Sequence, residues 1–473
     1  MIRGIKLKKM LEQAQTVGFV PPGAPQGTPP EKGYKAFRKQ LRFALGLAEN
    51  FQTGEPCINL NDRVLNAKEV DLAEVCHTLM PEDFRNGNAI REALNMPSRL
   101  RLQEAEGGVV GASQFAHVSA FSDTVGGLIE ALVLEAYQNP DYIGDEFFVT
   151  KTARVQGGYA IGVRMDGGVS DNPTLGEPYP TVGLNETRVR IPENIRNGIA
   201  IQLREDAFIY DRTDQIQAMA SNAGESVRRK KELRQADCVL GKTNTYFRDN
   251  VASNTYRTAV LDTVGENKTT PMHYINAQTG LPLTDWHDWN VAKQILSRNT
   301  DPATGWEIQV RPQESIMLVS PDNELLTQTI INATTLQTRT TSPTATQATA
   351  VSLDVRNHSN PLAEYGIRIM SSRLWYNRLL LAGTDCADGH TGALDATLTL
   401  GDEATKAQSA WLWGAFKRCF QYRQIIPFET MQAPLSSEDV RRDIVAIYVS
   451  REWGVPWALE PRYVFQGANT YTV

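Results

Sequence analysis

Residues 188–241 read RVRIPENIRNGIAIQLREDAFIYDRTDQIQAMASNAGESVRRKKELRQADCVLG, and this stretch decides the fold. Apolar residues alternate with small or polar ones at 199–204, which predicts a half-buried strand. Asp and Thr side chains at 211–214 then offer N-caps for a long helix, and Gly241 offers its C-terminal stop. The stretch contains no residue that looks catalytic, so it predicts a rigid strut joined to a sheet.

The predicted helix carries two apolar stripes. The first consists of Ile216, Met219, Ala220, Ala223 and Val227. The second, beyond Arg228, consists of Leu233, Ala236 and Leu240. At about 100° per residue the two stripes face different sides of the helix, so we expect it to pack on two partners along its length.

Composition excludes several classes of protein. The chain has 473 residues, enough for two or three domains, and its net charge of −6 is unlike that of a dedicated nucleic-acid reader. Its five cysteines are odd in number, widely spaced and without a CxxC pair, which fits a reducing compartment rather than a disulfide scaffold or zinc finger. No apolar run approaches the ~20 residues of a membrane span, and the basic N-terminus lacks the apolar segment of a signal peptide.

A long protruding hairpin is predicted just before the helix. EFFVTKTARV and YAIGVRM read as strands that meet at Gly157 and Gly158, a hairpin turn signal. GGVSDNPTLGEPYPTVG reads as a loop tip, and ETRVRIP returns as a strand. Because such a hairpin cannot bury both faces within one chain, we expect it to lie across a neighbouring copy.

Other elements are read from the same patterns. Residues 1–30 end in a Pro/Gly-rich arm, and KAFRKQLRFALGLAENF and AKEVDLAEVCHTLM read as helices. SAFSDTVGGLIEALVLEAYQNP, WHDWNVAKQILSRN and DNELLTQTIINATTL are predicted helices, and ESIMLVSP, YGIRIMSS, IVAIYVSREWG and RYVFQGANTY predicted strands. The Thr- and Ala-rich run TTLQTRTTSPTATQATA is expected to be a mobile loop, and the aromatic residues at 411–422 are expected in a core or an interface.

One motif imitates a nucleotide site. ADCVLGKT, from Ala236 to Thr243, fits a relaxed phosphate-loop pattern that lacks its first glycine. A phosphate loop needs a strand before it and a helix after it, whereas a long helix comes first here. We therefore interpret the motif as the end of that helix.

Two other polar groups have ordinary interpretations. The run Arg228-Arg229-Lys230-Lys231 could meet phosphate charge, but a solvated helix face is favoured. The group Asp385, Cys386, Asp388 and His390 could bind a metal, but clusters in Gly-rich turns are usually polar loops. The chain has no HExxH spacing, no GxSxG elbow and no GxGxxG after a strand, so no catalytic, cofactor-binding or metal residues are expected.

The order of these elements resembles the major capsid protein of tailed bacteriophages, the HK-97-type fold. The resemblance rests on the Gly/Pro-tipped hairpin, the strand of the IAIQLREDAF type, the Asp-Arg-Thr joint, the long helix and the closing SREWGVPWALEPRYVF, and it covers residues 113–473. It implies an α+β fold with an N-arm helix, an extended loop, a peripheral domain with a spine helix, and an axial domain. The resemblance places the N-arm helix at residues 113–144 and the extended loop at 145–198. The peripheral domain would comprise 199–284 with 405–473, and the axial domain 285–404.

Residues 1–112 depart from the family pattern. Many relatives carry a charged, helical scaffolding segment here that a protease removes, whereas this segment is Pro/Gly-rich and mixed. We expect it to stay, as an N-terminal arm and small helical extension that serves as a decoration or an inter-subunit tie.

The implied function is structural rather than enzymatic. Copies would assemble in the host cytoplasm into hexamers and pentamers of an icosahedral virion shell around double-stranded DNA, held without sequence preference. Portal, scaffolding and decoration proteins are further implied partners, and no membrane is. Glu177, Tyr179, Leu184, Arg188 and Arg190 are the expected inter-subunit contacts.

Two alternatives remain. A bacterial nanocompartment shell of the same fold would hold cargo enzymes instead of DNA. A nucleotide-hydrolysing enzyme would rest on Lys242 and Thr243 alone.

Overall fold

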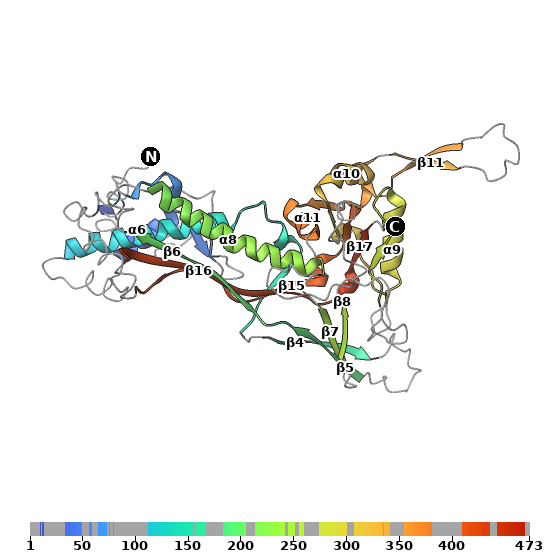
Figure 1. The fold of residues 1–473 in the computed structure, drawn as a ribbon, viewed down its shortest axis with the longest axis horizontal. Helices are drawn as coiled ribbons and strands as arrows, with labels where there is room; N and C mark the ends of the chain where they lie inside the picture. The colour runs from blue at the N-terminus through green and yellow to red at the C-terminus, as the bar shows by residue number, and fades with distance from the viewer. Residues whose placement is uncertain are drawn as a thin grey trace, which may run out of the picture. The chain divides into compact units, whose positions relative to one another are not determined.

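The computed structural model describes most of the chain in separate ranges. They are residues 10, 12–13, 34–49, 56–58, 65–72, 75, 79, 112–154, 157–166, 183–204, 213–241, 245–250, 255–259, 274–299, 307–333, 335–340, 354–360, 362–380, 409–435 and 442–468. The fold is α+β, with helices beside mixed and antiparallel sheets (Figure 1). The chain divides into two compact units. The first comprises Met1–Asp141, Ile195–Lys231 and Gln424–Gly454, and the second comprises Tyr142–Asn194, Glu232–Arg423 and Val455–Val473.

A four-stranded sheet in the order β3-β15-β16-β6 contributes residues 195–204, 424–433 and 444–454 to the first unit. Its strands are β3 (Val149–Thr152), β15 (Phe420–Ala433), β16 (Ile444–Ala458) and β6 (Ile195–Arg204). β16 and β6 are antiparallel over ten residue pairs, from Ile444 opposite Arg204 to Gly454 opposite Ile195. Side chains of β16 alternate between buried and half-buried from Ala446 to Trp453, so one side of this strand faces the core and the other is partly accessible.

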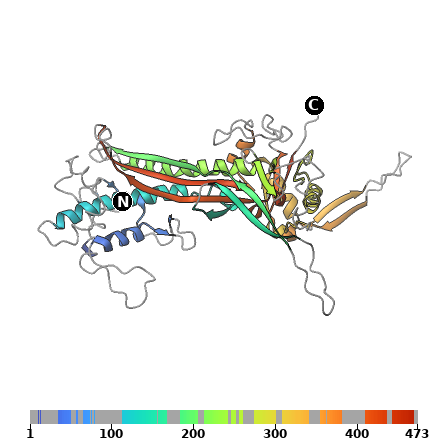
Figure 2. The ribbon, with the colours of Figure 1, turned by 90° about the horizontal axis from the view of Figure 1, so that it is seen from below.

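Two long helices, α6 (Ala112–Tyr137) and α8 (Thr213–Val239), share the core of the first unit with the sheet. α8 runs along β6 and β16 in Figure 1, and Figure 2 shows the same strands from below. The two helices approach closely at Gly224, where an added Cβ would lie 2.2 Å from the carbonyl oxygen of Val133. Only glycine permits this separation, because any side chain would overlap the facing backbone.

The N-terminal residues join the same core. They form α2 (Tyr34–Ala44), β1 (Leu47–Glu49), β2 (Pro56–Ile58) and the short 3-10 helix η1 (Ala67–Glu69). Buried apolar side chains include Phe37, Leu41 and Leu45, as the amphipathic pattern predicts. Three ion pairs connect this segment to α6: Arg38 with Asp123, Arg42 with Glu130, and Lys68 with Glu135.

The second unit contains a five-stranded mixed sheet in the order β13-β10-β14-β17-β9. Its strands are β13 (Arg368–Ser371), β10 (Ile316–Val319), β14 (Trp411–Gly414), β17 (Val464–Ala468) and β9 (Ala277–Thr279). The accompanying helices are α9 (Trp286–Ser297), α10 (Glu324–Asn332), α11 (Arg373–Leu380) and α13 (Phe416–Cys419). Short 3-10 turns η2, η3, η4, η5 and η7 occupy Gly144–Glu146, Pro312–Glu314, Pro321–Asn323, Ala363–Tyr365 and Pro461–Tyr463.

The predicted hairpin is present in the second unit as β4 (Gly158–Asp166) and β5 (Gly183–Ile191). They pair antiparallel from Gly158 opposite Ile191 to Asp166 opposite Gly183, and the predicted tip between them lies outside the described residues. Strands β7 (Thr245–Asn250) and β8 (Thr255–Ala259) extend it to a four-stranded sheet. The prediction of a turn at Gly157-Gly158 joining two paired strands is wrong, because β3 and β4 belong to different sheets.

Three further details differ from the sequence prediction. Ile199 is 38% exposed and Met219 is 45% exposed, although both belong to predicted apolar stripes. Ile199 lies on β6, which is the last strand in the sheet order, and so has no neighbouring strand on its outer edge. Part of the predicted Thr-rich loop is the strand β11 (Thr335–Thr340), which pairs with β12 (Asp354–Ser359).

Candidate functional site: buried polar contacts along helix α8

Helix α8 buries polar side chains over its second half. They are Arg228, Lys231, Glu232, Arg234, Gln235 and Asp237. The prediction that the basic run is a solvated helix face is therefore wrong for Arg228 and Lys231, which are only 3% and 6% exposed. Arg229 is exposed, as predicted for a solvated face, whereas Lys230 is half-buried.

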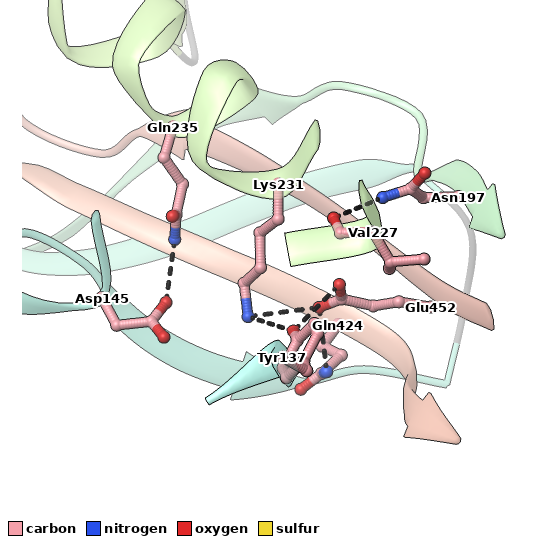
Figure 3. Close-up of polar contacts among 8 residues, drawn as sticks. All are labelled: Tyr137, Asp145, Asn197, Val227, Lys231, Gln235, Gln424 and Glu452. Atoms are coloured by element: carbon pink, nitrogen blue, oxygen red, sulfur yellow. Dashed lines mark hydrogen bonds and ion pairs between the residues drawn. The ribbon is translucent and has the colours of Figure 1, made fainter. Parts of the chain in front are cut away.

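Lys231 is held by an ion pair with β16. Its Nζ lies 3.2 Å from Glu452 Oε1 and donates to the hydroxyl of Tyr137 at 3.0 Å. The Tyr137 hydroxyl donates to Glu452 Oε2 at 3.1 Å, which closes a triangle of polar contacts (Figure 3). Glu452 is 1% exposed, so burial of its charge depends on these partners.

Aromatic and amide groups surround this triangle. The ring of Tyr137 stacks on Phe428 with centroids 4.0 Å apart, and the guanidinium of Arg228 lies 5.8 Å from the Tyr137 centroid. Gln424 Nε2 donates to Glu452 Oε1 at 3.4 Å (Figure 3). The carboxylate of Glu452 thus has three donors from three different elements.

Glu232 holds a chain segment of the second unit. Its carboxylate accepts from the backbone N–H groups of Ile143 and Gly144, at 3.1 and 2.9 Å, and from Trp375 Nε1 at 2.7 Å. A Cβ at Gly144 would lie 2.5 Å from Glu232 Oε2 and 2.1 Å from Gln235 Oε1, so the carboxylate reaches the backbone only because Gly144 has no side chain. These hydrogen bonds compensate the burial of the Glu232 carboxylate.

The last turns of α8 are fixed by further side-chain contacts in the second unit. Arg378 on α11 forms two hydrogen bonds with Asp237, from Nε at 2.8 Å and from Nη2 at 2.7 Å. Gln235 Nε2 donates to Asp145 at 3.1 Å (Figure 3). The Arg378–Asp237 pair is buried, so it fixes the rotation of the helix rather than facing a substrate.

The two apolar stripes of α8 pack as predicted on two cores. Ile216, Ala220, Ala223 and Val227 belong to the core of the first unit. Ala236 and Leu240 belong to a core of the second unit, and Leu233 is half-buried. The division between the units falls between Lys231 and Glu232.

The phosphate-loop motif is the end of α8, as interpreted from the sequence. Its residues 236–239 are helical, and Gly241 adopts the left-handed φ of 73° that ends helices. Asp237 is engaged by Arg378, and Lys242 and Thr243 lie outside the described residues. The helical start of the motif contradicts a phosphate loop, which needs a strand at this place.

The expected inter-subunit contacts are only partly described. Leu184, Arg188 and Arg190 lie on β5, opposite Met165, Ile161 and Tyr159 of β4. Arg188 also lies opposite Asp249 of β7. Glu177 and Tyr179 lie outside the described residues, as do Asp385, Cys386, Asp388 and His390. Their roles stay predictions.

The aromatic residues at 411–422 are core residues. Trp411, Trp413, Phe416, Phe420 and Tyr422 are all buried. Trp413 Nε1 donates to Ser315 Oγ at 2.9 Å, and Phe147 packs edge-on against Phe416. Within the described ranges, no three His, Cys, Asp or Glu side chains group as a metal site would.

Two buried groups have shifted pKa values. Burial raises the pKa of Asp123 on α6 to about 7, although Arg38 lies 4.0 Å away. Burial, together with Cys238 and Glu460, raises the pKa of the Cys419 thiol well above its usual value. Cys419 is therefore a neutral core thiol.

The sequence missed Tyr137, Gln424 and Glu452 as partners of the basic run. One signal was available for Glu452, which is in phase with the buried residues Ala446 and Tyr448 along the alternating strand β16. A carboxylate at an inward position of a strand needs a buried cation, and Lys231 meets that need.

Among the comparisons with known proteins, only solved structures match this chain. No family model and no curated protein matches the chain. The capsid of cyanophage P-SCSP1u matches with TM-score 0.40 and 11% identity, over 69% of this chain and 87% of that one. The mature capsid of bacteriophage PhiM1 matches with TM-score 0.36 and 13% identity, over 70% and 87%.

A virus-like particle from Pyrococcus furiosus matches with TM-score 0.34 and 7% identity, over 72% of this chain and 97% of that one. The matched structures are capsids and a virus-like particle. TM-scores below 0.5 do not transfer a role, so the function proposed below is argued from the chain's own elements. Over the described part of the chain, no helix has the length and apolarity of a membrane span.

Proposed function

We propose that this chain is a major capsid protein of the HK-97 type, with a structural rather than an enzymatic role. The observation that carries the proposal is the succession of the nine-residue arms β4 and β5, the strand β6 and the 27-residue helix α8. In the proposed assignment these are the extended loop, the peripheral-domain strand and the spine helix. Residues 285–404 are the axial domain, and residues 113–144 contain the N-arm helix.

The buried contacts along α8 support a structural role. Polar side chains that could do chemistry are instead bound to one another inside the cores, as for Lys231 with Glu452 and Arg378 with Asp237. These contacts fix the position of the helix, which suits a subunit that makes contacts with many copies. The proposed assembly consists of hexamers and pentamers that form an icosahedral virion shell around double-stranded DNA. It would form in the host cytoplasm with portal, scaffolding or decoration proteins.

Electron microscopy of the expressed protein tests the proposal. Closed shells are expected, and deletion of residues 172–184 should leave soluble subunits that form no stable shells, because the hairpin tip is the proposed inter-subunit contact. Glu177, Tyr179, Leu184, Arg188 and Arg190 are the proposed contact residues. Normal shells from the deletion would refute the hairpin assignment.

A nanocompartment shell is the second candidate, because the same elements would also enclose cargo enzymes. Mass spectrometry and nuclease treatment of purified particles distinguish the two contents. N-terminal sequencing of mature particles tests whether residues 1–112 stay. A new N-terminus between Gly107 and Ser113 would show that they are removed.

A further inference from the structure

Helix α6 has neighbours on more than one side within the first unit. A Cβ added at Gly126 would lie 3.7 Å from the ring of Tyr448 on β16, whereas one added at Gly127 would lie 3.3 Å from Leu45 Cδ1. Successive residues of a helix point about 100° apart, so the sheet and the N-terminal residues cover different sides of α6. The burial of α6 therefore depends in part on a segment that is distant from it along the chain.

Residues 34–79, which we call the docked segment, make a specific contact with α6 and α8. Its buried apolar side chains in the shared core include those of Phe37, Leu41, Leu45, Leu65 and Leu72. Lys68 Nζ lies 2.7 Å from Glu135 Oε1 on α6. The Val70 carbonyl accepts a hydrogen bond from Gln217 Nε2 of α8 at 3.0 Å. Because charge and hydrogen bonding add to the burial, the site fits this segment better than an arbitrary apolar peptide.

The order of the ion pairs shows that the docked segment runs along α6 from its N-terminal to its C-terminal part. Arg38, Arg42 and Lys68 pair in turn with Asp123, Glu130 and Glu135. To continue into α6, the chain must return from the level of residue 135 to residue 112, which is about 35 Å along the helix axis.

The connection between the docked segment and α6 is longer than this return requires. It comprises residues 80–111, which lie outside the described ranges. A chain of this length can span up to about 100 Å when extended. Connections as long as this are uncommon in compact units unless they serve a function. The docked segment can therefore reach an α6 other than its own.

We propose that in the assembled shell the docked segment of one copy binds α6 of a neighbouring copy. Exchange of an identical element keeps every contact described above, so it has a low cost. The choice between the two helices then depends on which lies within reach, and a shell holds neighbouring copies at high effective concentration. The exchange would tie copies together through a buried core. This inference rests on the proposed function and identifies the partner of the N-terminal extension.

Carbodiimide cross-linking of particles assembled from mixed chains tests the inference. The reagent joins a lysine directly to a carboxylate in contact with it, and the side chains of Lys68 and Glu135 are 55% and 21% exposed. Particles are assembled from equal amounts of isotopically light and heavy chains, cross-linked and analysed by mass spectrometry. The cross-linked peptides of residues 68 and 135 should include hybrids of one light and one heavy chain in particles, and none in dissociated subunits.

The second unit offers a matched control pair. Lys417 Nζ and Glu146 Oε2 lie 3.9 Å apart, and their side chains are comparably exposed. Their cross-link should contain no hybrids, because no exchange is proposed there. Lys68→Arg keeps the charge but removes the reactive amine, so it should abolish the first cross-link and leave the control cross-link unchanged.

The outcomes separate the inference from the proposed function. If the cross-link between residues 68 and 135 forms in particles without hybrids, the segment docks on its own chain and the inference is overturned. If only the control pair reacts in particles, the segment has left α6 on assembly, which overturns the inference as well. If wild-type chain forms no shells, the proposed function fails, and this inference fails with it.

Discussion

Lys231 and Glu452 show how single residues fix the position of a long helix. Apolar stripes alone permit a helix to slide or rotate with little loss of buried area, because they are non-directional. Lys231 lies 3.2 Å from a buried carboxylate and 3.0 Å from a tyrosine hydroxyl, and a shift of the helix would break both contacts. The ion pair therefore specifies the register of α8 on β16.

Lys231→Met should destabilise the chain strongly. It leaves Glu452 buried without its cation, which costs about 3–5 kcal/mol. Urea unfolding of the soluble subunit, followed by circular dichroism, measures this loss.

The double variant Lys231→Met/Glu452→Met is the control for that loss. It removes the cation and the carboxylate together and should recover much of the stability, because Glu452 is no longer buried without Lys231. A single variant as stable as wild type would show that the pair adds nothing to folding.

Asp123 should make stability depend on pH in the direction opposite to an ordinary carboxylate. Its pKa is about 7 in the folded chain, against 3.8 for the unfolded reference, so the folded state binds the extra proton between these values. The free energy of unfolding should therefore fall as pH rises from about 4 to 7, by at most about 4 kcal/mol.

Asp123→Asn removes this titration, so its stability relative to wild type should be higher at pH 8 than at pH 5. Denaturant unfolding at the two pH values gives the comparison. An equal difference between variant and wild type at both pH values would contradict the raised pKa.

The sequence could not reveal the burial of the basic run. Four consecutive basic residues point in all directions around a helix, and only the tertiary partners decide which of them are buried. Glu452 lies far along the chain from Lys231, and Arg378 lies far from Asp237. The end of the helix at Gly241 could be predicted because it depends on the glycine itself and not on distant residues.

At the scale of elements, the close packing of α6 against α8 depends on a glycine where the two helices meet. Gly224→Ala should destabilise the first unit by about 1–3 kcal/mol, since its Cβ would overlap the Val133 carbonyl at 2.2 Å. Thermal unfolding measures the change. In an exposed helical position the same substitution would instead stabilise by about 1 kcal/mol.

Asn222→Ala, at an exposed position of the same helix, is the matched control and should be neutral or slightly stabilising. If Gly224→Ala raised the melting temperature as well, the close approach of the two helices would not limit stability.

Elements with a strong local pattern were predictable, and those that depend on pairing were not. The hairpin arms, α8, α9 and β10 follow their apolar periodicity and turn residues. β7 and β8 read TYFRDN and TYRTA, which have no clear apolar face, and they are strands because they extend the β4–β5 pair. β11 and β12 are likewise polar strands that pair with each other.

For the whole molecule, assembly should raise thermal stability. Partners that bind only the folded state shift the unfolding equilibrium by mass action. Assembled particles should therefore melt at a higher temperature than dissociated subunits in calorimetry. The 172–184 deletion should melt as a subunit at all protein concentrations, whereas identical melting of particles and subunits would contradict stabilisation by assembly.

Gly144 and Glu232 have a consequence for evolution. The Gln235 amide and the Glu232 carboxylate together occupy the space in which a side chain at position 144 would begin, so a larger residue there requires both of them to move. Among homologues, we expect positions 144 and 232 to covary, so that a glycine at 144 accompanies an acidic residue at 232. A homologue with a bulkier residue at the first position should have lost the carboxylate at the second.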